Sequence, residues 1–241
     1  MRQTLVALIV LIVSIFPQFS SADVLDDLFK TVTKSPAESS LDDKTVVSGL
    51  REALSTGTAT AVQLVSRENG YFGNEAIKIL LPDKIQAAAE VLRKAGFGKD
   101  VDAFVLAMNR AAEKAAPKAK PVFLDAIRGM TFQDAKKILA GGDTAATDYF
   151  QEKTSDRLTA AFKPVVSQCM NDVGAARAYK TMTEKYLSLI PFGGMESMDL
   201  DHYVTGKALD GLFHMVGEEE KKIRTNPAAR TTELLKKVFA K

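Results

Sequence analysis

The sequence is poor in the residues that most often bind metals or carry catalysis. It contains one cysteine, two histidines and no tryptophan. The histidines, His202 and His214, form no H-x-x-x-H or H-E-x-x-H pattern, and a single cysteine excludes a C-x-x-C pattern. Asp210 precedes His214 by about one helical turn, a spacing more typical of a surface pair than of metal ligands. We therefore predict no metal site and no cofactor.

Motifs of nucleophilic catalysis are also lacking. No G-x-S-x-G occurs, and the cysteine has no histidine near it in the sequence. A triad or a carboxylate pair assembled in space stays open, because its members need not be close in sequence. Gly141-Gly142 ahead of Asp143 and Thr144 is a glycine turn that opens a helix, as at some phosphate sites. No lysine follows it, so a turn between helices, with Asp143 capping the second one, is the better interpretation, and we predict no catalytic residue.

An excess of charge of one sign is missing as well. Lysine and arginine number 32, against 30 aspartate and glutamate. Such a balance produces no strong field, and basic patches interleaved with aromatic residues are absent from the sequence. We predict no nucleic-acid partner.

Long hydrophobic runs are confined to the first residues. Arg2, the apolar run Leu5–Phe16 and the small residues Ser20-Ser21-Ala22 form the pattern of a signal peptide, residues 1–22. The run is shorter than the ~20 residues that span a bilayer, although a retained anchor is the alternative. No lipobox cysteine follows it. We expect an exported protein with no transmembrane segment after cleavage.

Helical periodicity dominates the rest of the chain. Apolar residues recur at i, i+3, i+4 and i+7 in most segments. This pattern predicts a single compact all-α domain over residues 41–241, with about nine or ten helices. Residues 23–40 are interpreted as a short helix and a flexible linker.

Two passages depart from that pattern. Ile77, Ile79 and Leu81 alternate with their neighbours ahead of a proline, so we expect at most a trace of extended structure near residues 76–81. Pro164 is expected to start or kink a helix, because proline lacks an N–H group and clashes with the preceding turn.

The same periodicity predicts which side chains are buried. Cys169 shares an apolar side with Val165, Val166 and Val173, so we interpret it as a small buried hydrophobe. A reactive thiol or a disulfide to another chain is the alternative.

The last part of the chain carries dense helical patterning, split by Asn226-Pro227. An apolar stripe begins at Leu200 and turns polar at Glu218. We predict that two i, i+4 pairs, Glu218 with Lys222 and Glu220 with Arg224, lie on a solvated face.

Long stretches of the chain resemble a known family. They are GLREALSTGTATAV from Gly49, AMNRAAEKAAPKAKPVFLDAIRGMTFQDAKKILAGGDTAATDYFQEKT from Ala107, and YVTGKALDGLFHMVGEEEKKIRTNPAARTTELLKKVF from Tyr203. From Gly49 to the C-terminus the chain resembles a bacterial family known as domain of unknown function 4197. The resemblance implies an exported helical domain and hence a periplasmic setting. It implies no activity, substrate or catalytic residue.

One charged cluster is the candidate site. Arg110 lies in the helix predicted over residues 99–116, which is apolar around most of its circumference. We therefore expect this helix to be central, and a charge there needs a partner. Glu113, one turn on, is the nearest candidate, and Asp125 with Arg128 would complete a network. A structural ion pair or a solvated edge is one interpretation of these residues. The other is a ligand-binding set of Arg110, Glu113, Asp125 and Arg128 at the polar end of an internal pocket, where Arg110 holds an acidic group.

Two hypotheses about function stay open. The first is a periplasmic binding module for a small or lipidic ligand, which requires a cavity with a few convergent polar groups. The second is an envelope interaction protein that acts through its surface, which requires an exposed apolar patch of several hundred Å². An envelope hydrolase without a recognisable motif is a weaker third. The partner is accordingly an unknown small molecule or an envelope protein.

The signal-peptide pattern makes a direct prediction. Cleavage after Ala22 would leave a mature chain that begins at Asp23. N-terminal sequencing of the protein from a periplasmic extract is expected to read DVLDDLF. An intact Met1 on membrane-bound protein would contradict the prediction.

Overall fold

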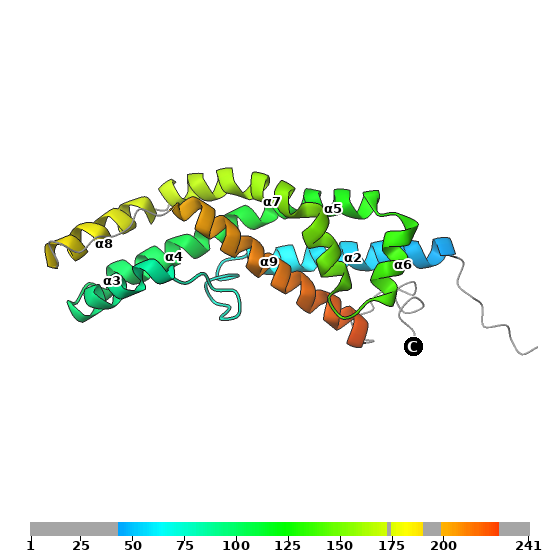
Figure 1. The fold of residues 1–241 in the computed structure, drawn as a ribbon, viewed down its shortest axis with the longest axis horizontal. Helices are drawn as coiled ribbons and strands as arrows, with labels where there is room; N and C mark the ends of the chain where they lie inside the picture. Colours follow the sequence, from blue (N-terminus) through cyan, green and yellow to red (C-terminus); the bar gives the residue numbers. More distant parts are fainter. Residues whose placement is uncertain (1–42, 173–174, 190–198, 227–241) are drawn as a thin grey trace, which may run out of the picture. The chain divides into compact units, whose positions relative to one another are not determined.

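The computed structural model describes residues 43–172, 175–189 and 199–226. All of them belong to one compact unit, residues 42–241. Within them the chain is helical and contains no strand, which confirms the all-α prediction (Figure 1). None of these helices is long and apolar enough to span a bilayer. Residues 1–22 and 23–40 and the closing helix expected after Asn226 lie outside the described residues.

Figure 1 labels the helices and colours them in the order in which they follow one another along the chain. They are α2 (Asp43–Ser66), α3 (Asp83–Lys94), α4 (Gly98–Ala115), the 3₁₀ helix η1 (Ala116–Lys118), α5 (Ala119–Gly129), α6 (Phe132–Ala140), α7 (Ala145–Asp172), α8 (Ala175–Leu189) and α9 (Leu200–Thr225). Within the described ranges eight of these are α-helices, slightly fewer than the nine or ten that we predicted.

One reason for the difference is Pro164, which lies inside α7 and does not end it. Proline removes one backbone hydrogen bond, to the carbonyl four residues back. Pro164 is exposed, so water can reach the freed carbonyl, whereas Phe162 and Val166 on either side are buried. Packing of both flanks into the same core therefore keeps the helix continuous.

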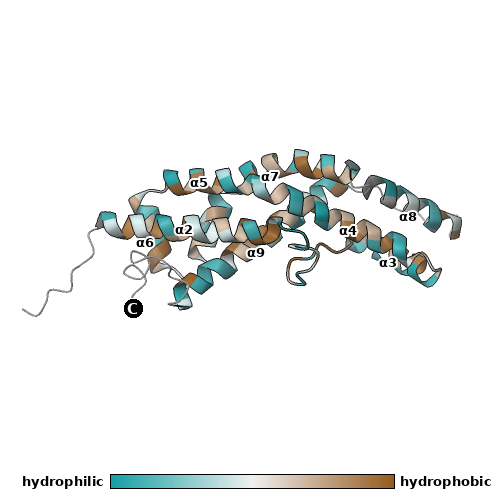
Figure 2. Ribbon diagram, turned by 180° about the vertical axis from the view of Figure 1, so that it is seen from behind, coloured by the Kyte–Doolittle hydropathy of each residue, from teal (hydrophilic) through white to brown (hydrophobic). Residues whose placement is uncertain are grey.

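The core forms where α4 meets its neighbours. Helix α4 packs against α3, α7, α8 and α9, and α9 also packs against α2 and α7. Most of α4 is buried, as predicted for a central helix; its buried apolar residues are Val101, Phe104, Val105, Ala107, Met108, Ala111, Ala112 and Ala115. Cys169 on α7 belongs to the same core, so its predicted burial is confirmed. Figure 2 shows the resulting alternation of hydrophilic and hydrophobic residues along each helix.

A buried ion pair, Glu220 with Arg224 on α9, corrects one prediction. The two side chains do pair, at 2.8 Å, but Glu220 is buried and not solvated. Lys222 pairs with Glu219, and not with Glu218 as predicted. Glu220 continues the buried stripe of Val216 at i+4, and this face of α9 meets the start of α7.

The position of Glu220 explains its burial. Its two carboxylate oxygens accept hydrogen bonds from the backbone N–H groups of Ala146 and Thr147, each at 2.9 Å, and from the Thr147 hydroxyl. These N–H groups belong to the first turn of α7 and have no partner within that helix. Arg224 in turn donates to the carbonyl of Ile138 near the end of α6, at 2.8 Å. One ion pair therefore satisfies the end of one helix and the start of the next.

We expect this pair to be essential for stability. Glu220→Ala would remove the acceptor of three buried donors and break the buried ion pair with Arg224, at a cost of about 3–5 kcal/mol in the free energy of unfolding. Glu218→Ala, two residues away on the exposed side, should change it by less than about 0.5 kcal/mol. Chemical denaturation of both variants measures the difference. A loss of stability in Glu220→Ala as small as that in Glu218→Ala would show that Glu220 is dispensable.

Candidate functional site

A long loop, residues 67–82, joins α2 to α3 and is shaped by unusual backbone positions. Asn69 has a φ of 61°, in the left-handed region that asparagine tolerates better than most residues. A Cβ atom on Gly70 would lie 2.5 Å from the carbonyl oxygen of Val65, so only glycine fits. A turn at Asn69-Gly70 thus brings the loop back over the end of α2.

Tyr71 fixes the loop to the core. Its side chain is completely buried, and its hydroxyl donates to the carbonyl oxygen of Ala208 on α9 at 2.6 Å. Gly211 makes room for the ring, since a Cβ there would approach Cε1 of Tyr71 to 2.7 Å. Burial, with a smaller contribution from the charge of Glu113, raises the pKa of the Tyr71 hydroxyl above its usual range. The hydroxyl therefore remains a neutral donor.

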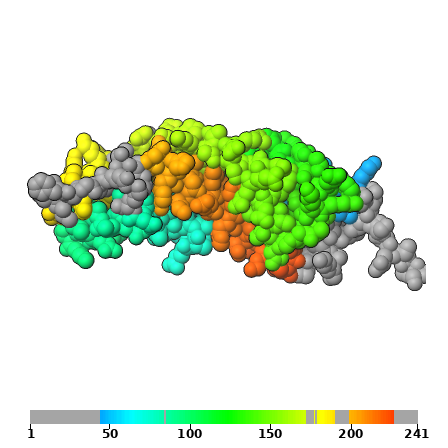
Figure 3. Space-filling model, in the orientation of Figure 1, coloured from blue at the N-terminus to red at the C-terminus, as the bar shows by residue number. Residues whose placement is uncertain are grey.

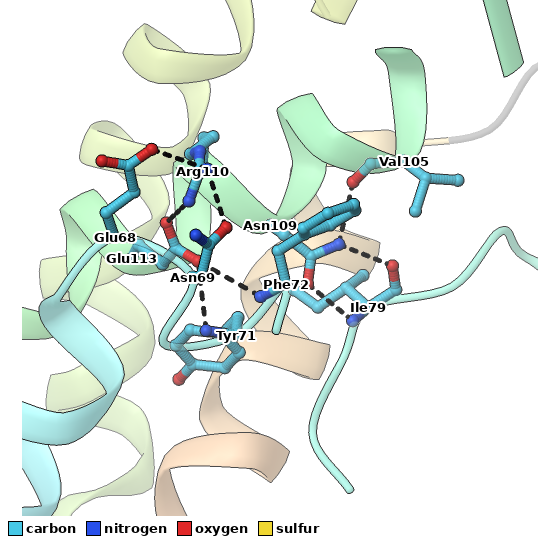
Figure 4. A network of polar contacts seen from close by, with 9 residues as sticks. All are labelled: Glu68, Asn69, Tyr71, Phe72, Ile79, Val105, Asn109, Arg110 and Glu113. Carbon is cyan, nitrogen blue, oxygen red and sulfur yellow. Dashed lines mark hydrogen bonds and ion pairs between the residues drawn. The ribbon is translucent and has the colours of Figure 1, made fainter. Parts of the chain in front are cut away.

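The predicted pair of Arg110 and Glu113 lies directly beside this loop (Figure 4). Arg110 donates to Oε2 of Glu113 at 2.6 Å, and Oε1 of Glu113 accepts from the backbone N–H groups of Tyr71 and Phe72 at 3.1 and 3.2 Å. The carboxylate of Glu113 is almost fully buried, whereas the Arg110 side chain is 23 % exposed. Both oxygens of Glu113 are therefore engaged by groups of the protein itself.

Arg110 also reaches the start of the loop. It donates to Oδ1 of Asn69 at 2.9 Å and pairs with Glu68 at 3.1 Å. These contacts make the Arg110–Glu113 pair a structural clamp on the loop. A role in ligand binding stays a prediction.

The other two predicted site residues lie in a different group. Asp125 on α5 contacts Arg157 on α7 at 2.7 Å and Arg128 at 3.6 Å. The Asp125 and Arg128 side chains are 48 % and 77 % exposed, so these are surface ion pairs. The network that we expected from all four residues is divided, because the break between α4 and α5 directs Asp125 towards α7.

Asn109 is a site residue that the sequence analysis missed. It is completely buried on α4, accepts from the backbone N–H of Ile79 at 2.8 Å and donates to the carbonyl of the same residue at 2.8 Å (Figure 4). Its amide also donates to the carbonyl of Val105. The signal was present, since Asn109 follows Val105 by four positions and so falls on the apolar stripe.

Two further hydrogen bonds hold the end of the loop in place. The Tyr203 hydroxyl on α9 donates to the carbonyl of Leu80 at 2.9 Å, and Gln86 donates to that of Leu81 at 3.3 Å. Ile77 and Ile79 are buried, but the Leu80 side chain is 59 % exposed. A fixed backbone therefore presents an exposed leucine.

Two grooves flank Leu80. The first, of about 400 Å³, lies between residues 76–80 and α9 and is lined on the helix by Tyr203, Lys207, Asp210, Gly211 and His214. The second, of about 480 Å³, lies on the side of α3 and α4 and includes Phe72, Leu81 and Val105. Figure 3 shows the loop beside α9 at the molecular surface. We define the Leu80 surface as residues 76–81 with these two grooves.

The remaining polar clusters suggest no other centre. His202 and His214 are exposed, and the described residues contain no group of three or more side chains arranged to hold a metal ion. At the glycine turn before α7, the carboxylate of Glu220 already occupies the N–H groups of Ala146 and Thr147. We predicted that Asp143 would cap this helix, but the acceptor comes from α9 instead.

Comparison with known proteins identifies the family. The family model for a protein of unknown function, DUF4197, matches residues 40–240. The chain belongs to this family. No curated protein and no solved structure matches it. The resemblance seen in the sequence is therefore confirmed, and any function must be argued from the site.

The clamp on the loop yields a stability test. Arg110→Ala would leave the buried carboxylate of Glu113 without its charged donor, which should cost about 1.5–3 kcal/mol. Arg128→Ala would break the exposed ion pair with Asp125, which also belongs to the four predicted site residues. This variant should cost less than about 0.5 kcal/mol. Denaturation curves measure both. If the fold of Arg110→Ala were as stable as the parent, the pair would be no clamp and the ligand interpretation would gain support.

Proposed function

We propose that this DUF4197 protein is a periplasmic interaction module that binds a polypeptide segment of a partner at the Leu80 surface. The observation that carries the proposal is the 59 % exposure of Leu80 on a backbone held by α4 and α9. The setting rests on the signal-peptide pattern of residues 1–22, and export is part of the proposal.

Preorganisation supports this role. Binding costs entropy when it orders a mobile segment, and a segment that is already fixed avoids that cost. Asn109, Tyr203 and Gln86 bond to three successive residues of the loop. Leu80 can act as an anchor, because an exposed apolar side chain gains free energy when a partner removes it from water.

The shape of the surface favours a polypeptide over an enclosed small ligand. Small-molecule sites bury most of their ligand in pockets of about 300–1,000 Å³. Both grooves beside Leu80 reach that volume but are open to solvent. A hollow lined by residues of α2, α6, α7 and α9 measures only about 20 Å³. The interaction hypothesis therefore has more support than the module for a small or lipidic ligand.

A peptide-display experiment tests the proposal. A library of randomised octapeptides would be selected against the mature protein, and the recovered peptides would be synthesised and titrated. We expect Leu80→Asp to weaken their binding roughly tenfold or more, the effect of losing about 1.4 kcal/mol or more at an anchor. The fold should change by less than about 0.5 kcal/mol, because the side chain is mostly exposed.

Leu187→Asp is the matched control. Leu187 on α8 is also exposed, at 41 %, but lies outside the Leu80 surface. Its substitution should leave peptide affinity unchanged. Failure to select any peptide, or equal binding to the Leu80 and Leu187 variants, would refute the proposal. Native mass spectrometry that showed a small molecule retained by Leu80→Asp would favour the ligand hypothesis.

A further inference from the structure

We infer that the partner segment binds as an extended strand, parallel to residues 78–80, in the groove between those residues and α9. The inference rests on the proposed function and specifies how the Leu80 surface recognises its partner. It follows from which backbone groups of the segment are already bonded and which remain.

Along one edge of residues 78–80, the backbone polar groups already have hydrogen-bond partners. The N–H and the C=O of Ile79 both bond to the side-chain amide of Asn109, each at 2.8 Å. The two groups of one residue point to the same side only when the backbone is extended, as in a strand. Asn109 therefore takes the place of a neighbouring strand on the side of α4 and leaves the opposite edge, formed by Lys78 and Leu80, towards α9.

Two groups on that opposite edge are engaged. The carbonyl of Leu80 accepts from the Tyr203 hydroxyl at 2.9 Å, and the N–H of Lys78 donates to the carbonyl of Asn74 at 2.8 Å. Among the described residues, the carbonyl of Lys78 and the N–H of Leu80 have no hydrogen-bond partner. In an extended backbone the N–H of Leu80 and the carbonyl of Lys78 point to the same side as the Leu80 carbonyl, which bonds to Tyr203, so these two groups lie towards the groove of about 400 Å³ beside α9.

The remaining pair of groups determines the direction of the partner. In a parallel pair, one partner residue donates to the carbonyl of residue i−1 and accepts from the N–H of residue i+1. With Ile79 as residue i, these are the two groups that remain. An antiparallel neighbour needs both the N–H and the C=O of one residue, and Lys78 and Leu80 each have one of the two engaged.

The charges of the groove indicate one side chain of the partner. Lys207 pairs with Asp210 on α9 at 3.3 Å. Lys78 lines both grooves and places its ammonium group over the Phe72 ring of the second one, 4.2 Å from the centroid, and no carboxylate among the described residues pairs with it. An acidic side chain of the partner beside Lys78 would compensate this charge.

The direction of the segment relative to α9 makes the geometry testable. Asn74 contacts Met215, Gly211 lies against Ile77, and Tyr203 bonds to Leu80. The segment therefore runs opposite to α9. A parallel partner strand would have its N-terminus near His214 and its C-terminus near Tyr203.

The probes are the octapeptides selected by display on the mature protein. A nitroxide on the peptide N-terminus is expected to broaden the NMR signals of His214 more than those of Tyr203, and a nitroxide on the C-terminus should do the reverse. N-methylation of single peptide residues should weaken binding roughly tenfold or more at the residue opposite Ile79, whose N–H donates to Lys78. N-methylation of its two neighbours, whose N–H groups point away, is the control.

A charge exchange tests the acidic side chain. Lys78→Glu should weaken a selected peptide, and replacing the acidic residue of that peptide by lysine should restore its affinity to within roughly threefold. The restored affinity is a result that mere loss of packing would not produce.

The outcomes separate this inference from the function on which it rests. Peptides that depend on Leu80 but show no sensitive N–H, or the reversed nitroxide pattern, would overturn the parallel strand and leave the interaction module intact. Peptides that bind independently of Leu80 would overturn both. A single sensitive N–H together with the expected nitroxide pattern supports both.

Discussion

A buried backbone N–H or C=O group needs a hydrogen-bond partner, and in a helical protein this requirement falls on the places where the chain leaves a helix. The structure meets it with side chains on α4 and α9. Glu113 accepts from two N–H groups of the loop between α2 and α3, and Asn109 bonds both polar groups of Ile79. Glu220 accepts from the first turn of α7. The arrangement of the helices therefore depends on three buried polar residues as much as on apolar packing.

Helix α9 connects the two regions where this happens. Its first half receives the Tyr71 hydroxyl at Ala208 and donates from Tyr203 to Leu80. Its second half carries the Glu220–Arg224 pair that joins the end of α6 to the start of α7. Burying a charge without its partner costs free energy, so displacing α9 would destabilise the fold. The hydrogen bonds to Tyr71 and Leu80 hold the irregular loop against α9.

The hydrogen bonds that hold the loop also determine which of its groups remain available to bind a partner. The polar atoms of Glu113 and Asn109 are used within the protein, and the predicted cluster around Arg110 is a clamp on the loop. Leu80 is left exposed, and within the described ranges two backbone groups beside it have no hydrogen-bond partner. Function in this DUF4197 protein is therefore best sought on the Leu80 surface and not around the charged residues, although charged residues attract attention first in a sequence.

The sequence by itself determined the helical class, the burial of Cys169, the central position of α4 and the pairing of Arg110 with Glu113. Each of these depends on spacing within one helix, and spacing is written directly in the sequence. Sequence reasoning missed the roles of Asn109 and Glu220 and the continuity of α7 through Pro164. Those depend on contacts between residues about 30 to 75 positions apart, such as Asn109 with Ile79 and Glu220 with Ala146. Only the tertiary structure decided them, because a polar residue on an apolar stripe shows that it needs a partner but not which distant backbone group supplies one.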